Sequence, residues 1–352
     1  MQKLLLVFTL VFSASLIAQE VEETKKKFSL SGSVDAYFKS NITGPNEASV
    51  DEAETPYFLT PNSSFANRSG FSLGMANVIA SYEGEKVGFV ADLVFGPRGE
   101  DAVFLSVGSS NIVNQLYVYW NLTEKVTLTF GNFNTFLGYE VISPVANFNY
   151  STSYMFSYGP FSHTGLKADI ALSEDFSLLL AVMNSTDYTE INLDGSYTFG
   201  GQLSYKDQFL NLIYGDQTGT TGTTFQIDYT GGTNITEAFF LGANATYNDT
   251  DGAEFYGVAL YPQYQISESF ALGARGEYFA EIAGGAGAIG VYDTEGDANV
   301  FAITLTGSYR IDGLIIKPEL RLDSTSEESF IDNDLIPTKS LASFLIGAIY
   351  EF

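Results

Sequence analysis

Hydrophobic and polar residues alternate along most of the chain, and the alternation is clearest in residues 339–352. Counting back from the last residue in steps of two gives an apolar row of Phe352, Tyr350, Ala348, Ile346, Phe344 and Ala342. The other face carries Glu351, Gly347 and Ser343, interrupted by Ile349 and Leu345. Alternation with a period of two predicts a β-strand, and the length suits one tilted crossing of a bilayer.

The same alternation recurs throughout the chain and predicts about sixteen strands. They are 28–39, 71–83, 86–96, 112–122, 126–136, 161–172, 176–184, 196–205, 208–215, 224–230, 238–248, 253–266, 270–281, 299–310, 314–323 and 339–352. An even number suits a bacterial barrel. Because 208–215 and 224–230 are short, fourteen or eighteen strands also fit. The fold class is therefore all-β, a transmembrane antiparallel up-and-down β-barrel in which 339–352 must pair with 28–39.

Charged residues recur on the polar face of these strands. A charge facing lipid at mid-membrane costs about 2–4 kcal/mol, so we assign these side chains to the lumen. The predicted pore-lining residues are Asp35, Lys39, Asp92, Lys167, Asp169, Asp228, Arg275, Glu277, Lys317, Glu319 and Arg321. Two interpretations stay open: neutralising ion pairs that hold the barrel's shape, or a field across the lumen that selects solutes by charge.

Short and long connections alternate between the strands. Four short connections are near copies that place a Ser/Thr-Glu pair between two strands, at 121–128, 171–178, 234–241 and 265–272. Asp312-Gly313 forms a fifth turn, of the hairpin type. Ser and Thr hydroxyl groups can accept hydrogen bonds from backbone N–H groups in tight turns. We therefore predict that these short connections are the periplasmic turns of the barrel.

The long connections are rich in Gly, Asn, Asp, Ser and Thr and suit the external surface; they are 40–70, 97–111, 137–160, 185–195, 216–223, 249–252, 282–298 and 324–338. Segment 137–160 differs because it is aromatic and carries little charge. A long aromatic segment is unfavourable when it is exposed to water, so we expect this segment to fold into the barrel mouth and constrict the lumen. Its candidate constriction residues are Tyr139, Glu140, Asn147, Tyr150 and Tyr154. Packing across the rim or against a neighbouring subunit is the alternative.

The N-terminus and the composition narrow the class further. Residues 1–18 have the charge, apolar core and small-residue end of a signal peptide, residues 19–27 form a polar tether, and 28–352 form the barrel. The chain has no Cys, 34 Gly, 22 Tyr, 29 Phe and a net charge of -26. Disulfide and thiol chemistry are excluded, and nucleic acid is not expected as a partner because phosphate binding requires clustered Lys and Arg. The negative charge has two compatible interpretations: it keeps the outer loops soluble, or it creates a field that attracts cations and repels anions.

The sequence offers little for catalysis or for a bound metal. His163 is the single histidine, and Ser157 or Ser162 could serve it as a nucleophile, but no Gly-x-Ser-x-Gly elbow exists. We expect a neutral, hydrogen-bonding His163. The acidic stretches 248–254 and 332–334 do not match calcium-loop spacing, and one histidine without cysteine does not make a zinc site. We therefore expect no enzyme activity, no cofactor and no metal.

Several stretches resemble the OmpL-like family of bacterial β-barrel porins. They are 64–71, 84–97, 131–140, 149–151 and 160–165. The resemblance implies a Gram-negative outer-membrane porin that allows passive diffusion of small solutes or ions, and it supplies no catalytic motif. The final strand also resembles the C-terminal signature of outer-membrane barrels, which implies that Tyr350 and Phe352 address the barrel-assembly machinery.

The expected partners are outer-membrane lipid, the assembly machinery and small solutes or ions. The sequence is compatible with a monomer and with a homotrimer, and barrels of this size are often trimers. The alternative function is a sealed barrel that acts in surface binding or adhesion.

Overall fold

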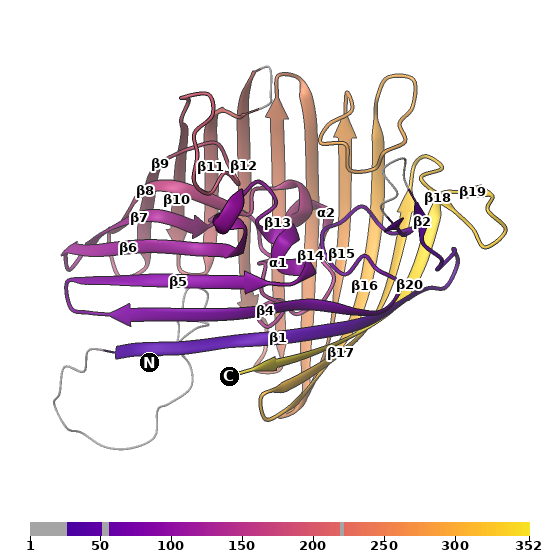
Figure 1. Ribbon diagram of the computed structural model, residues 1–352, viewed down its shortest axis with the longest axis horizontal. Coiled ribbons are helices and arrows are strands. Elements are labelled where there is room, and N and C mark those ends of the chain that lie inside the picture. The colour runs from indigo at the N-terminus through magenta and orange to yellow at the C-terminus, as the bar shows by residue number, and fades with distance from the viewer. Residues whose placement is uncertain (1–26, 51–55, 219–221) are drawn as a thin grey trace.

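The chain forms a closed antiparallel β-barrel of sixteen strands (Figure 1). The computed structural model describes residues 27–50, 56–218 and 222–352. The predicted signal peptide (1–18) and nearly all of the predicted tether (19–27) lie outside the described residues. The barrel strands are β1 (Lys27–Asn41), β4 (Gly70–Glu83), β5 (Val87–Phe95), β6 (Val113–Thr123), β7 (Val126–Asn134), β8 (Ser162–Ala171), β9 (Phe176–Met183), β10 (Thr198–Tyr205), β11 (Gln208–Asp216), β12 (Thr223–Asn234), β13 (Phe239–Thr250), β14 (Ala253–Ser267), β15 (Phe270–Ile282), β16 (Ala298–Ile311), β17 (Leu314–Thr325) and β20 (Ser340–Glu351).

Smaller elements lie in the connections. Two short hairpins pair β2 (Ser49–Val50) with β3 (Pro56–Tyr57) and β18 (Phe330–Ile331) with β19 (Pro337–Thr338). The helical segments are α1 (Pro97–Ala102), η1 (Gly108–Ile112) and α2 (Tyr154–Tyr158). None of the helices in the described part of the chain has both the length and the apolarity that a membrane crossing requires.

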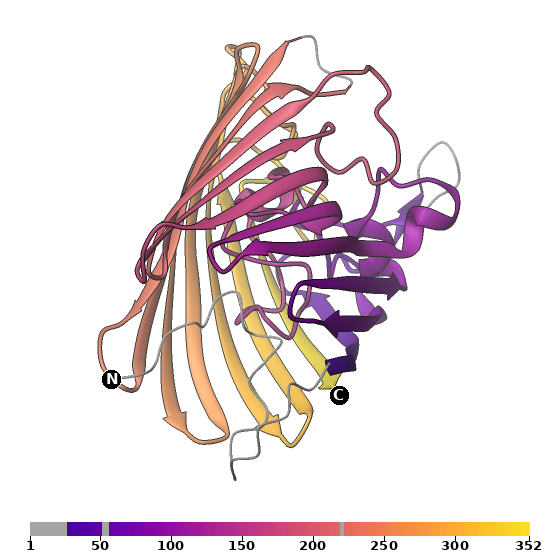
Figure 2. The same ribbon diagram turned by 90° about the vertical axis from the view of Figure 1, so that its left-hand side faces the viewer.

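The predicted strand count and the predicted closure are confirmed. Neighbouring strands pair in sequence order, and β20 closes the sheet by pairing with both β17 and β1. Asp35 lies opposite Ile349, and Lys39 lies opposite Leu345. The C-terminus lies beside the short turn at residues 312–313, because Tyr350 pairs with Leu314 (Figure 2). The pairing leaves no barrel strand with an open edge, as a sheet in lipid requires.

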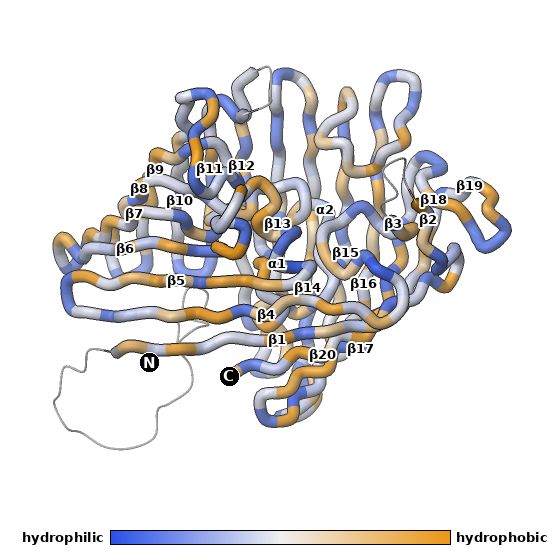
Figure 3. The backbone as a smooth tube through the Cα atoms, viewed as in Figure 1, coloured by the Kyte–Doolittle hydropathy of each residue, from blue (hydrophilic) through white to orange (hydrophobic). Residues whose placement is uncertain are grey.

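Side chains alternate between the lipid-facing surface and the interior, as the sequence predicts. In β17 Leu320 and Leu322 are exposed on the outside, whereas Lys317, Glu319 and Arg321 are buried inside. In β5 Val87, Phe89 and Phe95 face outward and Asp92 inward. The backbone in Figure 3 changes colour along the strands in keeping with this alternation. The outward face is therefore apolar and the inward face carries the charge.

Three of the four Ser/Thr-Glu connections are tight turns in which the Ser or Thr hydroxyl binds the backbone. The Oγ atom of Ser173 accepts the backbone N–H of Phe176 at 3.1 Å, and Thr236 Oγ1 accepts that of Phe239 at 3.0 Å. In the first turn Thr123 Oγ1 accepts the N–H of Lys125 at 3.1 Å. These bonds satisfy backbone groups that a two-strand connection would otherwise leave unpaired.

Two details of the predicted connections are wrong. The strand predicted at 224–230 continues to Asn234, because Gly231 and Gly232 still pair with the neighbouring strand. Gly231 and Gly232 have no side chain, so the apolar–polar alternation is not visible at these positions. The rings and amides of neighbouring residues cover both glycines. The connection predicted as long at 249–252 is a two-residue turn, since Thr250 pairs with Ala253. Asp251 and Gly252 have φ values of 54° and 87°, which a primed hairpin turn requires.

Candidate functional site in the barrel lumen

Residues 135–161, called the inward loop here, leave β7 and return to β8 through the interior of the barrel. Tyr150, Tyr154, Met155 and Phe156 in this loop are buried, and the loop bonds to inward side chains on strands that include β10, β12 and β1. The loop does not cover the rim. Because its backbone lies away from water, its N–H and C=O groups need partners from the barrel wall.

An ion pair joins the inward loop to β15. Arg275 and Glu140 both have almost no exposed surface, and their nearest charged atoms are 2.6 Å apart. Arg275 also donates to the backbone carbonyl of Ser151 at 2.7 Å and to Thr304 Oγ1 at 3.1 Å. The second oxygen of Glu140 accepts the N–H of Ser153 at 2.7 Å. Each charge therefore has several bonds that offset the cost of its burial.

Two wall carboxylates bind the backbone of the inward loop. Glu277 on β15 accepts the N–H groups of Tyr154 at 3.0 Å and Met155 at 2.8 Å. Glu319 on β17 accepts the N–H groups of Tyr150 at 2.9 Å and Ser151 at 3.3 Å. Hydrogen bonds to an ionised acceptor are stronger than neutral ones, so these pairs fix the height of the loop in the lumen.

Two wall cations bind loop carbonyl groups. Lys317 donates to the carbonyl oxygens of Pro144, at 2.8 Å, and Asn147. Arg321 donates to the carbonyl of Thr152 at 2.8 Å and pairs with Asp323 at 2.8 Å. Carboxylates therefore hold donors of the loop while cations hold its acceptors.

Further wall residues complete the attachment. Asp228 on β12 accepts the N–H of Gly138 at 2.9 Å. Asp35 on β1 accepts the N–H of Met75 at 3.0 Å and the hydroxyl of Tyr150. Lys39 bonds instead to Thr60 Oγ1 at 3.1 Å, in the connection after β1. Nine of the eleven predicted lumenal residues are thus buried, and eight of these bind the inward loop or another loop.

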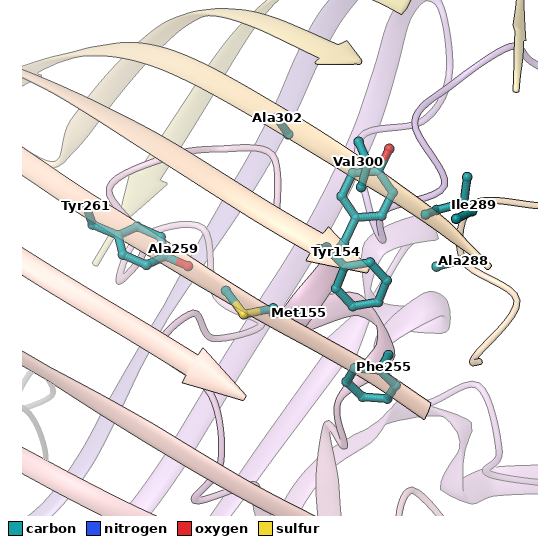
Figure 4. Packing of buried hydrophobic residues seen from close by; sticks show 11 residues of the cluster. Tyr154, Met155, Phe255, Ala259, Tyr261, Ala288, Ile289, Val300 and Ala302 are labelled. Carbon is teal, nitrogen blue, oxygen red and sulfur yellow. The ribbon is translucent and has the colours of Figure 1, made fainter. Parts of the chain in front are cut away.

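The predicted constriction residues take different positions in the loop. Tyr139 stacks on Tyr261 of β14 with ring centroids 4.1 Å apart, and Tyr154 stacks on Phe279 at 5.8 Å. Asn147 closes a turn within the loop by accepting the N–H of Val141 at 2.8 Å. Figure 4 shows Tyr154 and Met155 against the inward side chains of β14 and β16. This packing gives the loop an apolar core of its own inside the barrel.

Sequence reasoning missed Arg98, which belongs to the same assembly. Arg98 in α1 is buried and donates to the carbonyls of Ile142 at 2.9 Å and Tyr150 at 3.3 Å. Its guanidinium carbon lies 4.4 Å from the ring centroid of Phe65. A cluster of Phe65, Met75, Val94, Ala102, Val103, Ile142, Phe156 and Phe161 joins α1 to the inward loop. The signal that could have identified it is an arginine placed directly after a strand in a segment with little other positive charge.

The opposite wall is different. Lys167 and Asp169 on β8 pair at 3.1 Å, and their side chains keep 13% and 41% of their surface exposed. The inward residues Gln115, Tyr117 and Tyr119 on β6 are partly exposed. Asp92 is buried among amides, with Asn114 Nδ2 at 2.7 Å and Gln115 Nε2 at 3.2 Å. The start of the inward loop also contacts this side, since Phe136 and Leu137 pack on β9 and β11 in a cluster that Tyr117 touches, but polar side chains of β6–β8 stay partly accessible.

The remaining candidate groups make structural contacts. His163 Nε2 lies 2.9 Å from Thr135 Oγ1, and Ser157 donates to the carbonyl of Ser153 at 2.7 Å. No hydrogen bond joins His163 to Ser157 or Ser162 among the described residues. Asp332 accepts backbone N–H groups of its own turn, at 2.9 Å from Asp334. The part of the chain that the structure describes holds no cluster of three or more metal-ligating side chains.

The predicted assembly residues lie at the closing seam. Tyr350 and Phe352 are exposed on the outside of the barrel. Phe352 and Gly32 exchange two backbone hydrogen bonds of 3.0 and 3.1 Å. The last residue therefore belongs to the ladder that closes β20 onto β1.

Comparison with solved structures finds porins and other outer-membrane proteins. An anion-selective porin from Comamonas acidovorans matches with a TM-score of 0.60 and 11% identity, over 93% of this chain and 100% of the other. A loop L8 deletion mutant of OmpT, an outer membrane protein of Vibrio cholerae, matches with a TM-score of 0.55 and 14% identity, over 93% and 99%. The trimer form of in-vitro folded OmpT matches with a TM-score of 0.53 and 13% identity, over 93% and 99%. At these identities the likeness shows the fold alone.

Comparison of the sequence gives the family. The search among curated proteins found no match. The family model described as "Putative beta-barrel porin-2, OmpL-like" matches residues 27–352, which is the whole barrel. The chain therefore belongs to the OmpL-like β-barrel porin family, and it is a porin of the Gram-negative outer membrane.

Proposed function

We propose that this porin lets small hydrophilic solutes and ions diffuse along the side of the lumen formed by β6–β8, with the inward loop as the constriction. The observation that carries the proposal is that the charged bonds between the loop and the wall strands lie on one side of the barrel. These bonds go to β12, β15, β17 and β1, whereas Lys167 and Asp169 on β8 keep 13% and 41% of their side-chain surface exposed. Water and solutes require such a polar wall, and passive diffusion requires no catalytic group.

We infer a preference for cations from the charge of the interior. The buried cationic residues are Lys39, Arg98, Arg275, Lys317 and Arg321. The buried carboxylates are Asp35, Asp92, Glu140, Asp228, Glu277, Glu281, Glu319 and Asp323. This excess of carboxylates has the same sign as the net charge of -26. A negative field inside low-dielectric walls raises the local cation concentration.

Planar-bilayer recording tests both parts of the proposal. Purified protein should give stepwise conductance, and a salt gradient should give a reversal potential of the sign that cations produce. Neutral sugars of increasing size should reduce the current until they no longer enter, which gives the width of the passage. A silent barrel that is folded by circular dichroism would contradict conduction. A reversal potential of the opposite sign would contradict the cation preference alone.

The second candidate is a sealed barrel with a role in surface binding or adhesion. The observation in its favour is the burial of nearly the whole inner wall from β10 to β20. Two cavities beside the inward loop hold only about 10 and 40 Å³, which is the space of one or a few waters. The bilayer recording separates the two candidates, because a sealed barrel carries no current.

We propose a homotrimer as the assembly in the membrane. Support comes from the fold shared with OmpT of Vibrio cholerae, for which a trimer form is described. The barrel-assembly machinery should recognise Tyr350 and Phe352, which are exposed. Lipid should surround the apolar outer surface of the barrel. Chemical cross-linking in native outer membranes checks the subunit number: a ladder ending at three chains is expected, and a single-chain species alone would contradict it.

A further inference from the structure

Five glycines on the inner wall lie directly beneath large side chains of the inward loop. The pairs are Gly200 with Phe136, Gly242 with Tyr139, Gly273 with Phe148, Gly257 with Met155, and Gly347 with Tyr150. A β-carbon built on Gly200 would lie 2.6 Å from Phe136 Cζ, and one on Gly257 would lie 2.6 Å from Met155 Cγ. Real β-carbons do not approach other atoms so closely. The side chains of the loop therefore occupy the space that a β-carbon would fill.

At three of these glycines the nearest atoms all belong to the inward loop. For Gly242, Gly273 and Gly347 the three nearest atoms to an added β-carbon all belong to one loop ring, each closer than 3.0 Å. None of the three has a φ value in the left-handed region, so alanine fits the backbone. Glycine weakens a strand interior through its flexibility, and its use here is explained by close approach of another group.

Outward-facing glycines on the same strands behave differently. An added β-carbon on Gly276 of β15 would meet nothing within 4 Å, and one on Gly201 of β10 would meet only a carbonyl oxygen at 3.8 Å. Gly276 pairs with Ile303 and Leu260, which face lipid. Gly276 is therefore a matched control for Gly273, and Gly201 for Gly200.

We propose that these five glycines are sockets that fix the depth of the inward loop, and hence that they are positioning residues for the width of the passage. The sockets are distributed over β10, β13, β14, β15 and β20, so the loop is held along most of its length. The wall charges orient the loop backbone, and the sockets decide how close it lies to the wall. This inference rests on the proposed function for its effect on transport, but the seating of the loop can be measured without transport.

Filling one socket tests the proposal. Gly273→Ala and Gly347→Ala should each push one loop ring off the wall. Overpacking of this kind shifts the equilibrium between seated and displaced loop by about 5- to 150-fold. Single-channel records should show a second conductance level whose occupancy rises by that factor, while Gly276→Ala keeps the wild-type record. Records from both socket variants that match Gly276→Ala would overturn the proposal.

A size exchange checks that the effect arises from fit. Phe148→Ala should remove the ring that an alanine at position 273 would meet. The double variant Gly273→Ala with Phe148→Ala should therefore return the occupancy of the second level toward wild type. An unchanged or higher occupancy in the double variant would argue against a socket at Gly273.

Thiol labelling gives a readout that does not depend on conduction. The chain has no Cys, and Thr152 in the inward loop is fully buried. A Thr152→Cys reporter should react with a charged thiol reagent about 5- to 150-fold faster when Gly347→Ala is added. Equal labelling rates with and without Gly347→Ala would overturn the proposal that these glycines seat the loop. Faster labelling in a barrel that stays silent in the bilayer would support the sockets and contradict the proposed conduction, so the two failures are distinguishable.

Discussion

Arg275 and Glu140 form an ion pair with almost no exposed surface, at the point where the inward loop meets β15. Burial of two charges is favourable only when both keep their partners, so the pair acts mainly to specify one position of the loop. The two residues are 135 positions apart in the chain. Alternation in the sequence shows that Arg275 faces inward, but nothing in the pattern shows which loop residue it meets.

Removal of one partner should be costly. We expect Glu140→Ala to lower the free energy of unfolding by about 3–5 kcal/mol, because a buried guanidinium loses its counter-charge. The matched control is Asp169→Ala, which breaks the partly exposed pair with Lys167 and should cost about 0–1 kcal/mol. Urea titration of the barrel in lipid vesicles measures both values. Equal losses for the two variants would be inconsistent with a buried pair at Glu140.

Asp187 couples the end of the inward loop to pH. It lies in the connection after β9, outside the membrane-spanning strands, and accepts the N–H groups of Phe161 at 2.7 Å and Ser162 at 2.9 Å. Burial raises the pKa of Asp187 from 3.8 to about 6. The folded protein therefore binds this proton more tightly than the unfolded chain does.

The sign of the pH effect follows. The stability contributed by the raised pKa is fully present below about pH 4, and it is lost as the pH rises through about 6. The expected loss is about 2 kcal/mol between pH 4 and pH 7. Unfolding titrations of wild type and Asp187→Asn across this range measure it as a difference, since the variant cannot titrate at this position. Parallel pH profiles for the two proteins would contradict it.

At the scale of elements, the strands are predictable and the loop attachments are not. Successive side chains of a strand point alternately to the lipid and to the lumen, so the local sequence shows which residues lie on each face. Gly231 and Gly232 carry no side chain and hid the extension of β12 for that reason. The attachments of the inward loop join residues far apart in sequence, and alternation gives no distance across a lumen.

One signal for the loop was present in the last strand. Leu345 and Ile349 interrupt the polar face of β20, and in the structure both are buried in a cluster with Tyr37, Tyr150 and Ile315. An apolar side chain on the inner wall would be unfavourable beside water. Such interruptions therefore indicate where the inner wall is covered by another part of the chain.

The end of β20 should matter for assembly more than for conduction. Deletion of Phe352 removes two backbone hydrogen bonds to Gly32 and an aromatic ring at the membrane boundary. We expect a lower fraction of folded barrel in the outer membrane, while Phe352→Tyr keeps the wild-type fraction. Heat-modifiable gel mobility of membrane fractions measures this fraction. Normal amounts of assembled barrels that do not conduct would contradict an assembly role.

At the scale of the whole molecule, the lumen has two unlike sides. The inner wall from β10 to β1 is largely buried, and the wall formed by β6–β8 keeps partly accessible polar side chains. Most of the charged residues that the sequence predicts to be lumenal therefore hold the loop. Lys167 and Asp169 are the two that face the proposed passage. A sequence pattern gives a single inner face and cannot divide it in this way.

Thiol block of single-channel current tests this division most directly. The chain has no native Cys, so one cysteine can be placed on each side, at Asp169 on the accessible wall or at Thr304 beneath the loop. A charged thiol reagent should reduce the current through Asp169→Cys and leave the current through Thr304→Cys unchanged. Equal block of both variants, block of Thr304→Cys alone, or the absence of current from the wild-type barrel would contradict a passage along β6–β8.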